Sequence, residues 1–273
     1  MLLYSNGAPG AARETVIEAL LLGTGTSVGV PFIGCDCAVC TSGDPRNQRL
    51  RSSVLLRDEG TSLLVDCGPD FRAQALRYHI AHLDAVLLTH EHADHVLGLD
   101  DLRLLILHSK EPIPIYGAPP TLDRVREIYA YAFDGLDTGS FKPRFHLEAL
   151  ADLEAPVTLA GVDILPIPVE HGATTVVGLR VGDFAYIPDC KRIPEASLAK
   201  LRDLDTLVID GLRRKAHRTH FNVEEALAAI AEIGPRQAWL THLTHDLDAT
   251  TDDETLPGNV RLAYDGLILP VGR

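Results

Sequence analysis

The chain has 273 residues, of which 46% are hydrophobic and 23% charged, which is enough for one substantial globular domain. Its formal net charge of −13 repels polyanions, so a small anionic substrate is a better expectation than nucleic acid. No apolar run approaches the ~18 residues that cross a bilayer, and no export signal precedes the first strand. We therefore expect a cytoplasmic protein without membrane contact, whose five cysteines form no disulfide framework.

Short apolar runs and segments with helical spacing alternate along the chain after an extension predicted over residues 1–14. Residues 15–273 are expected to form a single domain that begins with a strand at 16–22. Further strands are predicted at 53–56, 62–66, 85–89, 162–166, 176–181, 206–210 and 237–241. Helices are predicted at 70–80, 96–107, 119–131, 194–203 and 223–233. The alternation indicates an α/β or mixed α+β class.

Residues with metal-binding or acid–base chemistry recur at or just past the ends of these runs: Asp66, His90, His171, Asp189 and His242. A rigid sheet holds such side chains in fixed positions, and strand ends converge at one edge. We therefore expect a functional site at that edge.

The segment His90-Glu-His92-Ala-Asp94-His95 is the most specific motif in the chain. His90 and His92 point the same way in an extended segment, and a turn that begins at Asp94 brings the next ligands to a neighbouring position. Four ligands within six residues suit two cations better than one. Imidazole and carboxylate donors fit Zn, Mn, Fe or Co, and their spacing does not choose among these metals.

From residue 16 nearly to the C-terminus, the order of these motifs resembles the metallo-β-lactamase superfamily. The resemblance implies an α+β fold, a four-layer αββα sandwich. It also implies two metal sites. His90, His92 and His171 would bind one metal, and Asp94, His95 and His242 the second. Asp189 would be the carboxylate that bridges the two metals. Asp66 matches the aspartate that steadies a ligand histidine by accepting its other N–H.

A second cluster, Cys35, Cys37 and Cys40, offers three thiolates to a tetrahedral structural zinc that needs a fourth ligand. His245 is the candidate for that ligand, because it follows a predicted active-site ligand by three residues. This pairing resembles the PhnP-like branch of the superfamily, as does the opening segment at 23–27. Buried or redox-active cysteines are the alternative, although C-x-C neighbours are poorly placed to bridge each other.

The resemblance to this branch implies a phosphodiesterase with two divalent ions, Mn or Zn, in its active site. A hydroxide that bridges the two metals is the expected nucleophile. His220 matches the branch's phosphate-contacting histidine and is the expected general acid, with Asp94 sharing proton transfer. A role of His220 in starting the helix at 223–233 is the alternative. The implied substrate is a small cyclic ribose phosphate or nucleotide-like phosphodiester, and dimers are common in this branch, so a homodimer is an expectation.

Three other functions remain open. A ribonuclease Z-like tRNA 3′ endonuclease shares the histidine core, but its tRNA-gripping arm has no evident counterpart and the charge of −13 opposes tRNA binding. A non-enzymatic accessory protein of the pyrroloquinoline quinone synthesis type has a similar cysteine cluster but lacks much of the histidine set. Thioester or lactone hydrolysis stays open because a fold does not determine a function.

The basic run at 213–218 is either a solvated face or a guide for an anionic substrate.

Overall fold

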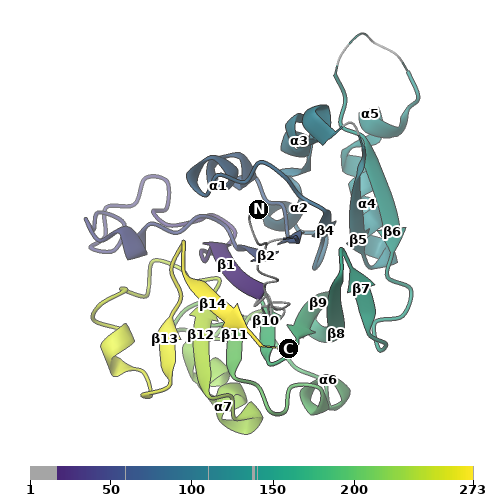
Figure 1. The fold of residues 1–273 in the computed structure, drawn as a ribbon. Coiled ribbons are helices and arrows are strands. Elements are labelled where there is room, and N and C mark those ends of the chain that lie inside the picture. The colour runs from purple at the N-terminus through teal and green to yellow at the C-terminus, as the bar shows by residue number, and fades with distance from the viewer. Residues whose placement is uncertain (1–16, 59, 110, 137–138, 140, 273) are drawn as a thin grey trace, which may run out of the picture.

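Two seven-stranded β-sheets face each other over the part of the chain that the computed structural model describes, which is residues 17–58, 60–109, 111–136, 139 and 141–272 (Figure 1). The extension predicted over residues 1–14 lies outside these residues. Within the described chain, no helix has the length and apolar character to cross a bilayer.

The first sheet has the strand order β14-β1-β2-β3-β4-β5-β6. Its strands are β1 (Ile17–Gly23), β2 (Ser53–Arg57), β3 (Ser62–Val65), β4 (Ala85–Leu87), β5 (Ile113–Gly117), β6 (Phe145–Ala149) and β14 (Ile268–Val271). Strands β3 to β6 run parallel, and the others pair antiparallel.

The second sheet has the order β13-β12-β11-β10-β9-β8-β7. Its strands are β7 (Val157–Leu159), β8 (Val162–His171), β9 (Thr174–Val181), β10 (Phe184–Ile187), β11 (Thr206–Asp210), β12 (Gln237–Thr241) and β13 (Val260–Leu262). Strands β10 to β13 run parallel. The carboxyl ends of parallel strands therefore gather at one edge of each sheet.

Helices cover the outer faces of the two sheets. They are α1 (Phe71–Arg77), α2 (Ala93–Val96), α3 (Arg103–Ser109), α4 (Pro119–Ile128), α5 (Ala130–Phe133), α6 (Glu195–Ala199) and α7 (Val223–Ile233), with 3-10 turns at Pro45–Asn47, Leu99–Leu102 and Asp253–Thr255. One apolar core lies between the sheets, where Leu63 of β3 and Phe184 of β10 are fully buried. Each sheet also has an apolar core on its outer face, where its helices pack. Leu122 of α4 belongs to the core on the first sheet, and Ile230 of α7 to the core on the second. These layers confirm the α+β, four-layer αββα sandwich.

Each predicted strand overlaps an observed one, and the runs at 206–210 and 237–241 coincide with β11 and β12. The end predicted at residue 166 is wrong, because β8 continues to His171. Among the described residues, β8 pairs only with β9 from Leu165 to Val169, and prolines are tolerated where one side of a strand has no partner strand. Strands β5, β6, β7, β10, β13 and β14 are not predicted, because they are short, half-exposed or interrupted by proline and form only when a neighbouring strand completes their hydrogen bonds.

The single helix predicted at 96–107 is also wrong. The segment breaks at Gly98 into α2, a 3-10 turn and α3. A Cβ atom on Gly98 would overlap the carbonyl oxygen of Gly68, and Gly98 N donates to the carbonyl of Cys67 at 2.8 Å. This close approach fixes the short turn that carries Asp94 and His95.

Candidate active site

The predicted site residues meet at the edge where strands of both sheets end. Asp66 and His90 come just after β3 and β4 in the first sheet. His171 ends β8, and Asp189 and His242 follow β10 and β12 in the second sheet. Residues that are up to 176 positions apart, as 66 and 242 are, therefore line one edge.

The first cluster consists of His90, His92, His171 and Asp189, whose potential ligand atoms all lie within 4.8 Å of one another. His90 Nε2 lies 2.9 Å from His92 Nδ1 and 3.9 Å from Asp189 Oδ2. His171 Nδ1 donates to the carbonyl of Thr219 at 2.7 Å, because that oxygen can only accept. The hydrogen bond leaves Nε2 of His171 with a lone pair for a cation.

The second cluster consists of Asp94, His95 and His242. His95 Nε2 lies 3.2 Å from Asp94 Oδ2 and 3.3 Å from Asp189 Oδ1. Asp189 Oδ1 is also 3.4 Å from His242 Nδ1. One carboxylate oxygen of Asp189 thus faces each cluster, as a bridging ligand would.

The chemistry of this donor set fits divalent cations. Asp94 Oδ2, His95 Nε2 and Asp189 Oδ1 are buried and have no hydrogen-bond partner. Such atoms are expensive to bury unless something else satisfies them. Burial alone raises the pKa values of Asp94 and Asp189, but the neighbouring histidines outweigh it and hold both pKa values below the usual range. Both carboxylates are therefore ionised, as metal ligands must be.

Asp66 lies behind the second cluster and is fully buried. Its Oδ2 accepts from His95 Nδ1 at 2.7 Å, and its Oδ1 accepts from the backbone N–H of Thr89 at 2.8 Å. This arrangement sets the tautomer of His95 so that its other nitrogen faces the cluster. Asp66 and His242 both have positive φ, 63° and 59°, which is backbone strain of the kind found at functional sites.

His220 lies beside both clusters. Its ring centroid is 4.4 Å from that of His171 and 4.9 Å from that of His242. Its Nδ1 donates to Asp210 Oδ2 at 2.8 Å. Burial lowers the pKa of His220, but the hydrogen bond and charge of Asp210 outweigh it, so the pKa is raised. The alternative role in starting α7 does not apply, because Asn222 caps that helix.

The chain that follows His220 is held by its own contacts. Phe221 N donates to the carbonyl of Cys190, next to Asp189. Asn222 caps α7 together with Glu225 in a capping box, and Lys191 Nζ lies 2.7 Å from the same glutamate. These contacts tie the start of α7 to the loop after β10, and the position of the imidazole is set accordingly.

Two arginines of the basic run at 213–218 make contacts of their own. Arg214 pairs with Asp252, and the Arg213 side chain donates to the carbonyls of Lys215 and Ala216. Lys215 and Arg218 are exposed. A guiding role for this run toward an anionic substrate stays a prediction.

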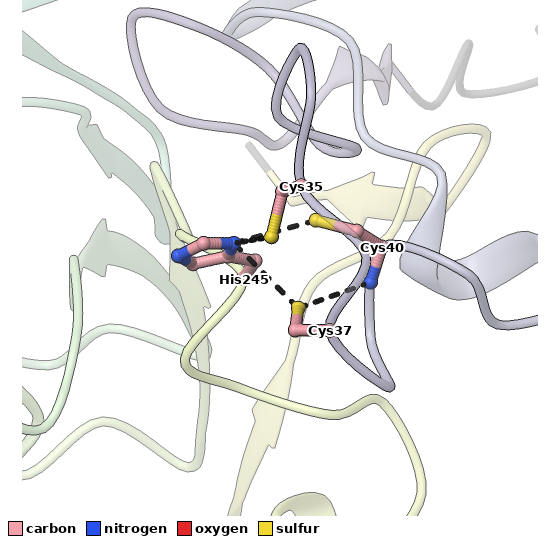
Figure 2. Close-up of side chains that lie close together, drawn as sticks. All are labelled: Cys35, Cys37, Cys40 and His245. Atoms are coloured by element: carbon pink, nitrogen blue, oxygen red, sulfur yellow. Dashed lines mark hydrogen bonds between the residues drawn. The ribbon is translucent and has the colours of Figure 1, made fainter.

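The cysteine cluster converges on one imidazole nitrogen (Figure 2). His245 Nδ1 lies 3.3 Å from Cys35 Sγ, 3.7 Å from Cys37 Sγ and 3.3 Å from Cys40 Sγ. A tetrahedral zinc with ordinary bond lengths would separate its sulfur and nitrogen ligands by about 3.6 Å. The arrangement therefore fits a bound zinc ion without rearrangement.

Contacts around the cluster support the same interpretation. The Phe32 ring stacks on His245 at 3.9 Å between centroids, and Phe32 N donates to Cys40 Sγ at 3.3 Å. Burial raises the pKa of the Cys40 thiol to about 11. Three thiolates packed this closely require a cation to remain charged at neutral pH.

A family model described as the beta-lactamase superfamily domain matches residues 61–243. The chain belongs to the metallo-β-lactamase superfamily. A crystal structure described as a new diphosphatase from the PhnP family is 38% identical, with a TM-score of 0.87 over 93% of this chain and 97% of that one. The chain therefore belongs to the PhnP-like branch. Human tRNase Z, short form, has a TM-score of 0.67 over 94% of this chain and all of that one, but at 19% identity it shows the fold alone.

Curated relatives carry two other names. An octanoyltransferase of Porphyromonas gingivalis is 39% identical over 256 residues, which is 92% of this chain but 51% of that protein. The chain thus spans about half the length of this relative. Coenzyme PQQ synthesis protein B of Methylorubrum populi is 30% identical over 228 residues, 71% of this chain and 73% of that protein.

Sequence reasoning did not identify Asp210, Thr89 or Thr219 as residues of this metallo-β-lactamase site. Asp210 could have been found, since it ends the predicted strand at 206–210 just as other site residues end theirs. Thr219 acts through its backbone carbonyl, which every residue has, so no residue type marks its role. Thr89 holds Asp66 through its backbone N–H and also through its hydroxyl, which donates to Asp66 Oδ2 at 2.8 Å.

Cys37→Ser is expected to remove one tightly held zinc ion per chain, because a thiolate ligand is lost. The melting temperature should fall as well, since the free energy of zinc binding no longer stabilises the folded state. Metal analysis after dialysis checks this, and the two active-site positions should still fill. Asp36→Asn is the matched control, since Asp36 lies between two of the cysteines but is exposed and outside the cluster. A full zinc complement in Cys37→Ser would disprove the structural-zinc assignment.

Proposed function

We propose that this chain is a metal-dependent phosphodiesterase that hydrolyses a small phosphodiester, such as a cyclic ribose phosphate or a nucleotide-like diester. The observation that carries the proposal is the placement of His220. Its ring lies beside one histidine of each cluster, and Asp210 binds its Nδ1. A carboxylate-bridged pair of cation sites with a protonated imidazole alongside suits a dianionic transition state with a poor leaving group.

Seven residues would hold two divalent cations, Mn or Zn: His90, His92 and His171, Asp94, His95 and His242, and Asp189 between them. Bound there, the cations supply a water nucleophile at neutral pH and offset the charge on the phosphate. Asp66 and Thr219 orient two of the imidazoles through His95 Nδ1 and His171 Nδ1.

His220 is the proposed general acid. Asp210 binds its Nδ1, so Nε2 is the atom free to protonate the leaving oxygen. The raised pKa keeps the imidazole protonated at a higher pH than an exposed histidine would allow. Asp94, which is ionised and lies 3.2 Å from His95 Nε2 through its Oδ2, is proposed to share proton transfer near the second cluster.

The proposal favours a small diester over the rival substrates. A charge of −13 opposes tRNA binding, so a ribonuclease Z-like activity is disfavoured. The complete set of clustered donors speaks against the non-enzymatic role of the PQQ accessory protein, despite 30% identity. Acyl transfer, suggested by the octanoyltransferase relative, has weak support, because about half of that protein lies outside the match.

The test is hydrolysis by purified protein loaded with Mn or Zn. Bis(p-nitrophenyl) phosphate and a cyclic ribose phosphate are expected to be cleaved, and the metal-free protein should be inactive. An octanoyl thioester, a β-lactam and a tRNA precursor with a 3′ trailer serve as comparison substrates. Cleavage of the thioester or the β-lactam alone would show that the assignment is wrong, and efficient trimming of the tRNA precursor would favour the ribonuclease Z-like alternative.

A further inference from the structure

A cavity of about 360 Å³ opens beside the first ligand cluster. Glu91, which sits between the ligands His90 and His92, forms part of its wall. The start of α4, the loop after β6 and the turn between β8 and β9 form the rest. That turn directly follows His171, so two walls of the cavity are next in sequence to residues of the first cluster.

The walls of the cavity are almost free of charge. Among the described residues that line it, Glu91 is the single charged one, and the others are alanine, proline, leucine and threonine. The Glu91 carboxylate lies 3.5 Å from the hydroxyl oxygens of both Thr121 and Thr174. These hydrogen bonds are long, so the carboxylate oxygens can still accept stronger ones from a ligand.

The cavity is unsuited to a phosphate group. Glu91 repels anions, and the α4 N-terminus offers little compensation because its first two residues, Pro119 and Pro120, have no backbone N–H. The phosphate must therefore lie at the histidine clusters. The cavity is left for the organic substituent that the phosphate carries.

We propose that this cavity binds the sugar ring of the substrate, with Glu91 accepting hydrogen bonds from the ring hydroxyls; this rests on the proposed phosphodiesterase function. Thr121 and Thr174 provide hydroxyls that both donate and accept beside the carboxylate, which matches a vicinal diol. A quaternary ammonium group is usually bound by aromatic faces, and none of the described residues that line this cavity is aromatic. The volume suits a single ring, since small-ligand pockets begin at about 300 Å³.

Three p-nitrophenyl phosphate diesters that differ only in the second ester group test the proposal: ribosyl, ethyl and choline. Wild-type protein should prefer the ribosyl diester over the ethyl diester in kcat/KM. Glu91→Gln should reduce the ribosyl-to-ethyl ratio about tenfold, because hydrogen bonds to a charged group are lost. Ala151→Leu should also reduce that ratio, because it fills the cavity from an exposed wall that contains no ligand.

Glu195→Gln, an exposed glutamate on α6 outside the cavity, is the matched control and should keep the wild-type ratio. Metal content is measured for every variant. If Glu91→Gln loses metal, Ala151→Leu is the variant that tests whether the cavity binds the sugar ring. A preference for the choline diester, equal rates for all three, or an unchanged ratio in metal-loaded Glu91→Gln or Ala151→Leu overturns the sugar-pocket assignment. If wild-type protein hydrolyses none of the three, the proposed phosphodiesterase function is wrong, and the sugar-pocket assignment that rests on it is wrong too.

Discussion

Asp189→Ala is expected to lower kcat/KM for phosphodiesters by at least about 10³-fold, because both proposed cation sites would lose their shared ligand. The carboxylate oxygens of Asp189 lie 3.3 Å from His95 and 3.9 Å from His90, one facing each cluster. Metal analysis should show that at least one active-site ion is lost, while the zinc on the cysteine cluster is kept. Steady-state kinetics at saturating Mn or Zn provides the measurement.

Asp205→Asn is the control for this substitution. Asp205 pairs with Arg236 at the start of β11, at the opposite end of the strand from the site, so activity and metal content should stay at wild-type levels. Full diesterase activity in Asp189→Ala would rule out the bridging role and, with it, the binuclear mechanism.

His220→Ala is expected to slow hydrolysis of a cyclic ribose phosphate by about 10²–10⁴-fold, the range for removal of a general acid. The alkoxide of that substrate needs a proton to leave, whereas p-nitrophenolate leaves without one. The loss with bis(p-nitrophenyl) phosphate should therefore be much smaller. Both active-site metals should remain bound, because His220 is not among the seven residues proposed to hold them. Loss of a metal in this variant would mean that His220 is a ligand instead, since it also lies near Asp189 and His242.

The pH profile distinguishes the same roles. Protonated His220 is the active form, so activity should fall as pH rises through its raised pKa. Asp210→Asn removes the negative charge that raises this pKa. The alkaline limb should then move to lower pH by about one to two units. An unshifted limb in Asp210→Asn would show that another group carries the proton.

The elements that were predicted well have strong local patterns. Strands β11 and β12 are continuous apolar runs, and α7 combines an amphipathic repeat with an Asn222 capping box, so local sequence alone specifies them. The prediction of a single helix at 96–107 is wrong because the structure there depends on a contact with a distant part of the chain. Its break at Gly98 depends on the approach of Gly68, thirty positions earlier in the chain, and no local pattern reveals that contact.

The candidate site divides in the same way. Cys35, Cys37 and Cys40 lie close in sequence, so a few residues of chain determine their geometry, and His245 completes their cluster as the motif predicted. Asp210 could not be assigned to His220 from sequence, because their contact depends on where β11 ends relative to the loop before α7. The cavity beside Glu91 is likewise formed by segments that lie far apart in the chain, from the start of α4, the loop after β6 and the turn between β8 and β9.

By itself, the sequence determined the ligand chemistry of this protein, since the motif from His90 to His95 and the cysteine cluster place their donors within a few residues of one another. Only the tertiary structure showed that Asp189 turns one oxygen toward each cluster, that Asp210 contacts His220, and that a cavity opens beside Glu91. These depend on contacts between segments far apart in the chain, and such contacts form only when both sheets pack against their common core.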